Sequence, residues 1–181
     1  MRGPPLRRLL HVGSAVVLLI PLWASWDLLR LALGILAAIA VALDLARIGL
    51  PNVGRRIVEM VPVFRDMEAR RLSGATWLSL GYALSAWFPP IAPAAGILVS
   101  ASADPAASMV GGLSADSVGK TVIGSLAALG TSVVVLTLLG LPWQAVVVGA
   151  VIGTALERWP GPCDDNLVVA PGVACVVWLL T

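Results

Sequence analysis

The stretch Asp164-Asp165-Asn166-Leu-Val-Val-Ala-Pro-Gly-Val-Ala-Cys-Val-Val-Trp-Leu-Leu, residues 164–180, places two neighbouring carboxylates directly before a long apolar run. Acidic residues are scarce in this chain, which has 10 of them and is 59% hydrophobic. Ionisable groups at membrane depth are costly unless they are paired, hydrated or bound to metal. The stretch therefore predicts a membrane helix whose first residues carry chemistry.

The rest of the chain has the composition of a membrane protein. Its mean hydropathy is +0.94, and its 181 residues include 18 Gly and 13 Pro. This is too apolar for a soluble globule and too interrupted for a coiled coil. The net charge of +2 is small, so nucleic acid is not an expected partner. We expect a single all-α polytopic membrane domain over residues 1–181.

Apolar runs bounded by charge, Gly or Pro predict about seven transmembrane helices. Several runs are short, since a helix of about 16 residues spans roughly 24 Å of a hydrocarbon core of about 30 Å. Re-entrant hairpins at 89–90 and at 140–142 are the alternative for the runs on either side of those positions. The predicted spans are 11–26, 28–46, 73–88, 90–103, 121–139, 142–157 and 167–181.

The distribution of charge predicts the orientation. With a cytoplasmic N-terminus, all of the 12 basic residues except Arg30 fall on one side, which satisfies the positive-inside rule. We therefore expect an integral protein of the cytoplasmic (plasma) membrane with its functional site facing the cytoplasm. Residues 1–26 resemble a signal peptide, but Pro21 and Trp23 favour a retained first helix.

The segment 51–71 alternates apolar residues with arginines and acids. This pattern predicts a cytoplasmic amphipathic helix lying in the membrane interface. A solvated loop whose arginines extend toward water is an equally good interpretation.

Gly119-Lys120-Thr121 contains the only lysine of the chain and closes a near match to a Walker A loop. A Walker loop follows a buried strand, whereas this segment follows a membrane helix, so the nucleotide-binding fold of that motif is excluded. Backbone amides of a helix that begins near Thr121 can still face an anion. The segment predicts phosphate contact, with a plain helix start and a snorkelling lysine as the alternative.

Asp104 precedes Pro105, which predicts the N-cap of a helix with proline at its first position. Because Asp164 and Asp165 also precede a helix on the same side, the three carboxylates together predict a Mg²⁺ site. Asn166 is either part of this site or the cap of the last span.

Two other ionisable residues have ordinary interpretations. Glu157 stands beside Arg158, which predicts an interfacial ion pair. His11 is the single histidine and is more typical of a hydrogen-bonded interface residue than of a general base. Gly149 and Gly153 form a GxxxG pair that predicts helix packing.

Taken in order, these segments resemble the membrane family of CTP-dependent lipid kinases that includes dolichol kinase, phytol kinase and the yeast-type diacylglycerol kinase. The chain differs from the family pattern at Ile123, where relatives usually carry Glu. The residues that carry the resemblance are Arg7-Arg8-Leu-Leu-His11, Glu68-Ala-Arg-Arg71-Leu-Ser-Gly74-Ala-Thr-Trp, Asp104-Pro-Ala-Ala with Gly111, Gly119-Lys120-Thr121 with Gly124-Ser125, and Asp164-Asp165-Asn166-Leu167.

The resemblance implies transfer of the γ-phosphoryl of CTP to a lipid alcohol, such as a polyprenol, a phytol-like alcohol or diacylglycerol, with Mg²⁺ as cofactor. The alternatives are a phosphatidate cytidylyltransferase-like enzyme and a small non-enzymatic membrane transporter. The expected site comprises catalytic Asp104, Lys120 and Asp165, metal ligands Asp104, Asp164 and Asp165, nucleotide contacts Gly111, Gly119, Lys120, Thr121, Gly124 and Ser125, and further candidates Arg7, His11, Glu68, Arg71, Glu157 and Asn166.

Overall fold

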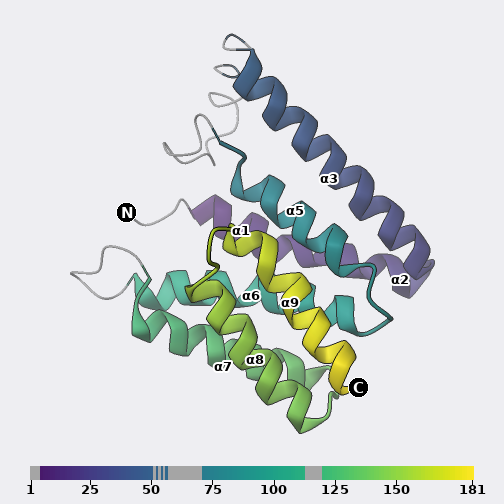
Figure 1. The fold of residues 1–181 in the computed structure, drawn as a ribbon, viewed down its shortest axis with the longest axis vertical. Helices are drawn as coiled ribbons and strands as arrows, with labels where there is room; N and C mark the ends of the chain where they lie inside the picture. Colours follow the sequence, from purple (N-terminus) through teal and green to yellow (C-terminus); the bar gives the residue numbers. More distant parts are fainter. Residues whose placement is uncertain (1–4, 51, 53, 55, 57–70, 113–119) are drawn as a thin grey trace.

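The computed structural model describes residues 5–50, 52, 54, 56, 71–112 and 120–181, and all regular structure among them is helical (Figure 1). Two helical stretches, Leu6–Trp23 and Trp26–Gly49, are long and apolar enough to cross a membrane. The elements are α1 (Pro5–Gly13), the 3-10 helix η1 (Ser14–Leu19), α2 (Ile20–Trp23), α3 (Trp26–Gly49), α5 (Gly74–Ser85), α6 (Ala92–Gly111), α7 (Val122–Leu138), α8 (Trp143–Arg158) and α9 (Asp165–Leu180).

Four of these helices begin at a side chain that accepts a hydrogen bond from a backbone amide of the first turn. Ser25 accepts from Leu28 at the start of α3, and Ser73 accepts from Thr76 at the start of α5. Thr121 and Asp164 cap α7 and α9 in the same way. Such caps satisfy amides that have no partner within the helix, so the sequence itself fixes where these helices start.

The helix α9 lies in the middle of the bundle, where it packs against α5, α6 and α8 (Figure 1). Small residues permit this close packing. A Cβ on Gly81 would lie 2.6 Å from the carbonyl oxygen of Asn166, and a Cβ on Gly96 would collide with the carbonyl oxygen of Ala170. A Cβ on Gly153 would lie 3.0 Å from Val173, which confirms the packing role predicted for the GxxxG pair.

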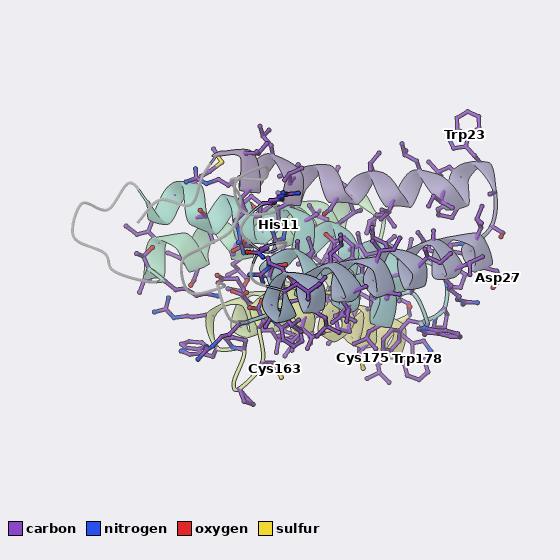
Figure 2. All side chains as sticks on the ribbon, turned by 90° about the horizontal axis from the view of Figure 1, so that it is seen from above. His11, Trp23, Asp27, Cys163, Cys175 and Trp178 are labelled. Carbon is purple, nitrogen blue, oxygen red and sulfur yellow. The ribbon has the colours of Figure 1, made fainter. Side chains whose placement is uncertain are left out.

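The bundle has two distinct ends. One end gathers the starts of α5, α7 and α9 and the ends of α3 and α8, since Arg47 bonds to Arg71 and Lys120 contacts both Glu157 and Asp165. Figure 2 shows Trp23, Asp27 and Trp178 toward the opposite end from His11 and Cys163. Residues distant in sequence therefore meet at the end that holds the candidate site.

The predicted helix boundaries are correct for most spans but wrong at Asp104. This residue lies inside α6, which continues through Pro105 to Gly111, so it does not begin a helix. Proline removes one backbone hydrogen bond but is tolerated in a helix that neighbouring helices hold in place. Here the end of α6 packs closely on α7, because a Cβ on Gly111 would lie 2.7 Å from the Thr121 hydroxyl.

The first helix begins at Pro5 rather than at His11, and its middle turn, η1, is a 3-10 helix. Most of the predicted amphipathic segment 51–71 lies outside the described residues, as do the candidates Glu68 and Gly119.

Candidate functional site

Among the described residues, three carboxylates from three helices meet at one end of the bundle. They belong to Asp104 of α6, Glu157 of α8 and Asp165 of α9, and each offers an oxygen that lies within 4.8 Å of the other two. Like charges at this separation repel one another unless a cation or proton neutralises them. The three side chains line one small pocket together with His11 and Asn166.

Glu157 has a buried oxygen that lacks a described partner in this pocket. The residue is only 4% exposed, and its Oε2 atom has no hydrogen-bond partner among the described residues. A buried carboxylate oxygen without a partner is unfavourable by roughly 1–3 kcal/mol or more. The free space in the pocket is about 10 Å³, which is room for about one water-sized ligand.

This donor set fits a hard divalent cation. Mg²⁺ prefers oxygen ligands and binds proteins through one or two carboxylates plus phosphate oxygens and waters. Glu157 belongs to this set, so the interpretation of Glu157 as the partner of Arg158 is wrong. Arg158 instead donates to the Ser125 hydroxyl at 2.9 Å and stacks over the Trp159 ring.

Lys120 lies directly on the carboxylates. Its ammonium group is 3.0 Å from Oε1 of Glu157 and also contacts Oδ2 of Asp165 and the backbone carbonyl of Glu157. Burial lowers the pKa of the Lys120 ammonium, but the carboxylates of Asp165 and Glu157 raise it by more. The pKa of Lys120 therefore lies above its usual value, and the lysine is charged at neutral pH.

His11 closes the other side of the pocket. Its Nε2 lies 3.1 Å from the carbonyl oxygen of Ser100, which accepts a hydrogen bond from that nitrogen. The other ring nitrogen, Nδ1, faces Oδ2 of Asp104 at 3.6 Å. His11 is thus a buried residue hydrogen-bonded to α6 that also lines the pocket beside the carboxylate of Asp104.

Asp164 caps α9 and lies outside the cluster of three carboxylates, so its predicted role as a metal ligand stays a prediction. Its Oδ1 accepts hydrogen bonds from the backbone amide of Asn166 at 3.1 Å and from the side-chain amide of Asn166 at 2.7 Å. Burial raises the pKa of Asp164, and neighbouring Asp165 adds to the rise while the bonds from Asn166 oppose it. Asp164 rather than Asn166 is the N-cap of α9, and Glu157 completes the carboxylate cluster in its place.

Several predicted nucleotide contacts have partners within the protein. The Thr121 hydroxyl accepts from the Gly124 amide at 3.0 Å, and the Ser125 hydroxyl donates to the Thr121 carbonyl at 3.2 Å. A Cβ on Gly124 would lie 2.8 Å from the Ala107 carbonyl oxygen, so this glycine lets α7 approach α6. The close contact between the end of α6 and the start of α7, next to Lys120, is therefore formed by Gly111, Thr121, Gly124 and Ser125. Contact of these residues with nucleotide stays a prediction.

Arg7 and Asn166 lie beside the start of α5. A Cβ on Gly74 would collide with the Arg7 guanidinium and would lie 3.3 Å from the side-chain nitrogen of Asn166. Glycine at position 74 leaves room for Arg7 in this conformation, and Arg7 is a cation near the carboxylate pocket. The structure thus brings Arg7, His11 and Asn166 to the site through contacts that local spacing does not reveal.

The sequence analysis did not predict a buried hydrogen-bond network that joins the end of α3 to the start of α5. Oδ1 of Asp44 accepts from Arg47 at 2.9 Å, and its Oδ2 accepts from the Ser73 amide at 2.6 Å and the Thr76 hydroxyl at 2.7 Å. Arg47 also donates to the carbonyl oxygen of Arg71 at 2.6 Å. The spacing of Asp44 and Arg47 by three residues within an apolar helix was the available signal.

No protein-family model matches this chain, and no curated protein or solved structure is significantly similar to it. The function must therefore be argued from the site and from the motifs themselves.

Proposed function

We propose that this protein is an integral membrane kinase that transfers the γ-phosphoryl group of CTP to the hydroxyl of a lipid alcohol at the cytoplasmic leaflet. The observation that carries the proposal is the pocket of Asp104, Glu157 and Asp165, with Lys120 on its rim and Oε2 of Glu157 without a partner. The motif order that resembles the CTP-dependent lipid kinases supports the choice of reaction.

An apolar exterior supports the membrane setting. Besides the two long helical stretches, α7 and α9 are shorter apolar helices. Large apolar side chains point outward along the bundle, among them Leu31, Ile35, Val134 and Val151. In a bilayer these side chains contact lipid instead of water, and the remaining helices would complete about seven spans.

The distribution of charge supports the orientation. Exposed tryptophans lie toward both ends of the bundle, as at the two interfaces of a membrane, with Trp159 beside Arg158 near the carboxylates and Trp23, Trp87, Trp143 and Trp178 at the opposite end. Arg30, which pairs with Asp27, lies at that same end. Most described arginines lie at the carboxylate end, which the positive-inside rule assigns to the cytoplasm.

The chemistry of phosphoryl transfer suits this set of residues. The reaction needs alignment of donor and acceptor and neutralisation of charge, with little covalent help from the protein. Asp104, Glu157 and Asp165 would hold Mg²⁺, which when bound neutralises charge on the donor phosphates. Lys120 and Arg7 would contact phosphate oxygens.

The decisive experiment uses purified protein in detergent with CTP labelled at either the γ- or the α-phosphate, and a panel of acceptors that comprises the alcohols polyprenol, phytol and diacylglycerol and the phospholipid phosphatidate. Transfer of γ-label to the lipid fraction, lost in Asp104→Asn, supports the kinase. Transfer of α-label instead means that the protein is a cytidylyltransferase. If no label enters any lipid acceptor from CTP, and none enters from labelled ATP either, the proposed function is wrong.

A further inference from the structure

In the structure Lys120 occupies the position of a cation at the carboxylate pocket. Its ammonium group contacts Glu157 and Asp165, which are two of the three carboxylates of the cluster. Among the described residues, the third carboxylate, Asp104, faces His11 instead. The ammonium and a divalent cation would therefore use the same oxygens.

The formal charges of the cluster leave room for both the Lys120 ammonium and a divalent metal ion. Three carboxylates and one ammonium leave two negative charges within a small and largely buried space. Oε2 of Glu157 still lacks a partner when Lys120 is in place, so the lysine satisfies the cluster only in part. The pocket thus retains affinity for a divalent cation, but Lys120 competes for the oxygens that would bind it.

We propose that Lys120 is an exchangeable internal counter-ion, which weakens binding of a free divalent cation and moves to the donor phosphates when the metal and nucleotide bind together. The second half of this inference rests on the proposed function, whereas the first half does not. Competition for Glu157 and Asp165 follows from the contacts alone.

The surroundings of Lys120 allow such an exchange. The residue precedes Thr121, the N-cap of α7, so it stands outside the helix, and its side chain is 36% exposed. Its four-carbon stem can move without breaking the hydrogen bonds that cap α7. A lysine ammonium binds phosphate as a mobile point charge, unlike the rigid fork of arginine.

The test measures binding of Mn²⁺, an electron-spin-resonance probe for Mg²⁺ sites, to the full-length protein in detergent without nucleotide. Lys120→Met should bind Mn²⁺ about tenfold more tightly than the wild type, because the competing charge-assisted contacts are gone. Lys120→Arg keeps the charge and should bind like the wild type. Arg158→Met is the matched control, since Arg158 bonds to Ser125. Equal Mn²⁺ affinity in the wild type and Lys120→Met would overturn the inference.

Stability supplies a second readout. Without cation, Lys120→Met should melt at a lower temperature than the wild type, and millimolar Mn²⁺ should restore its melting temperature. A variant that stays unfolded with Mn²⁺ present would mean that Lys120 is purely structural, which contradicts the exchange.

A non-hydrolysable CTP analogue tests the second half. It should tighten Mn²⁺ binding to the wild type by a larger factor than to Lys120→Met, because phosphate oxygens bind the metal in both proteins but only the wild type has a lysine to release. If the analogue affects neither protein while Lys120→Met still binds Mn²⁺ more tightly, the proposed nucleotide function fails and the counter-ion role stands. If the analogue tightens Mn²⁺ binding equally in both proteins, the move to phosphate is wrong.

Discussion

Glu157 is the residue whose environment says most about function. A glutamate that is 96% buried normally has both oxygens bonded, yet here Oε1 meets Lys120 and Oε2 meets no described partner. A site that binds a cation needs such an unsatisfied oxygen in its ligand-free form. The same argument does not apply to Asp164, whose Oδ1 oxygen is used by Asn166.

Glu157→Gln should lower lipid phosphorylation by about a hundredfold or more, because a neutral amide of the same size cannot neutralise a cation. The variant should also lose any rise in melting temperature that Mg²⁺ gives the wild type. Activity and thermal unfolding in detergent measure both effects. Full activity in Glu157→Gln would remove this residue from the cation site.

Asp164 separates the two possible ligand sets, since Asp104 belongs to both. Asp164→Ala should lose about 1 kcal/mol of stability, because a helix cap is gone, while activity stays within a few-fold of the wild type. Asp104→Asn should keep its stability and lose nearly all activity. Loss of nearly all activity in both Asp164→Ala and Asp104→Asn would instead restore the set predicted from the sequence, in which Asp164 binds the metal together with Asp104 and Asp165.

At the scale of the elements, glycine contacts decide how closely the helices pack. Gly96→Ala should destabilise the protein by about 1–3 kcal/mol, because the new methyl group collides with the Ala170 carbonyl between α6 and α9. Gly130→Ala in α7 is the matched control, since a Cβ there meets nothing within 4 Å. It should be neutral or stabilise by up to about 1 kcal/mol. Denaturant titration in mixed micelles compares the two.

The packing of α3 on the start of α5 depends on the buried ion pair of Asp44 and Arg47. Asp44→Ala should lower stability by about 3–5 kcal/mol, because it leaves the Arg47 guanidinium, 2% exposed, without its carboxylate partner. Asp27→Ala breaks a pair with the same spacing in the same helix, but Asp27 is 86% exposed, so the loss should stay under about 1 kcal/mol. Similar losses in both variants would show that the Asp44 network is not what joins the two helices.

At the scale of the whole molecule, the proposed orientation predicts which surface is reachable from outside a cell. Native Cys163 is exposed near the carboxylate end, whereas Trp143 is exposed at the opposite end. Both test proteins carry Cys175→Ala. A membrane-impermeant maleimide should label, on intact cells, the variant that also carries Trp143→Cys and Cys163→Ser. It should leave Cys163 unlabelled until the cells are permeabilised. Labelling of Cys163 on intact cells would reverse the orientation.

Local sequence determined the helical elements of this protein. Apolar runs predicted the helices, and capping residues such as Thr121 fixed their starts, because these interactions join residues three or four positions apart. The same local reasoning failed at Asp104, where Asp-Pro has the pattern of a helix start but α6 continues. Packing of that helix end on α7 outweighs the lost hydrogen bond, and packing is not encoded in the dipeptide.

The site was predictable only in part. Asp104, Lys120 and Asp165 stood out because isolated charges in an apolar chain are expensive, and the structure does bring them together. Glu157 was only a further candidate and was not placed with the carboxylates, because its neighbour Arg158 offered an obvious partner. Tertiary structure alone decided that Glu157 faces Lys120, 37 residues away, and that Asp165 meets Lys120 across 45 residues. Contacts at such separations depend on how whole helices pack, which no local pattern of charge or hydrophobicity specifies.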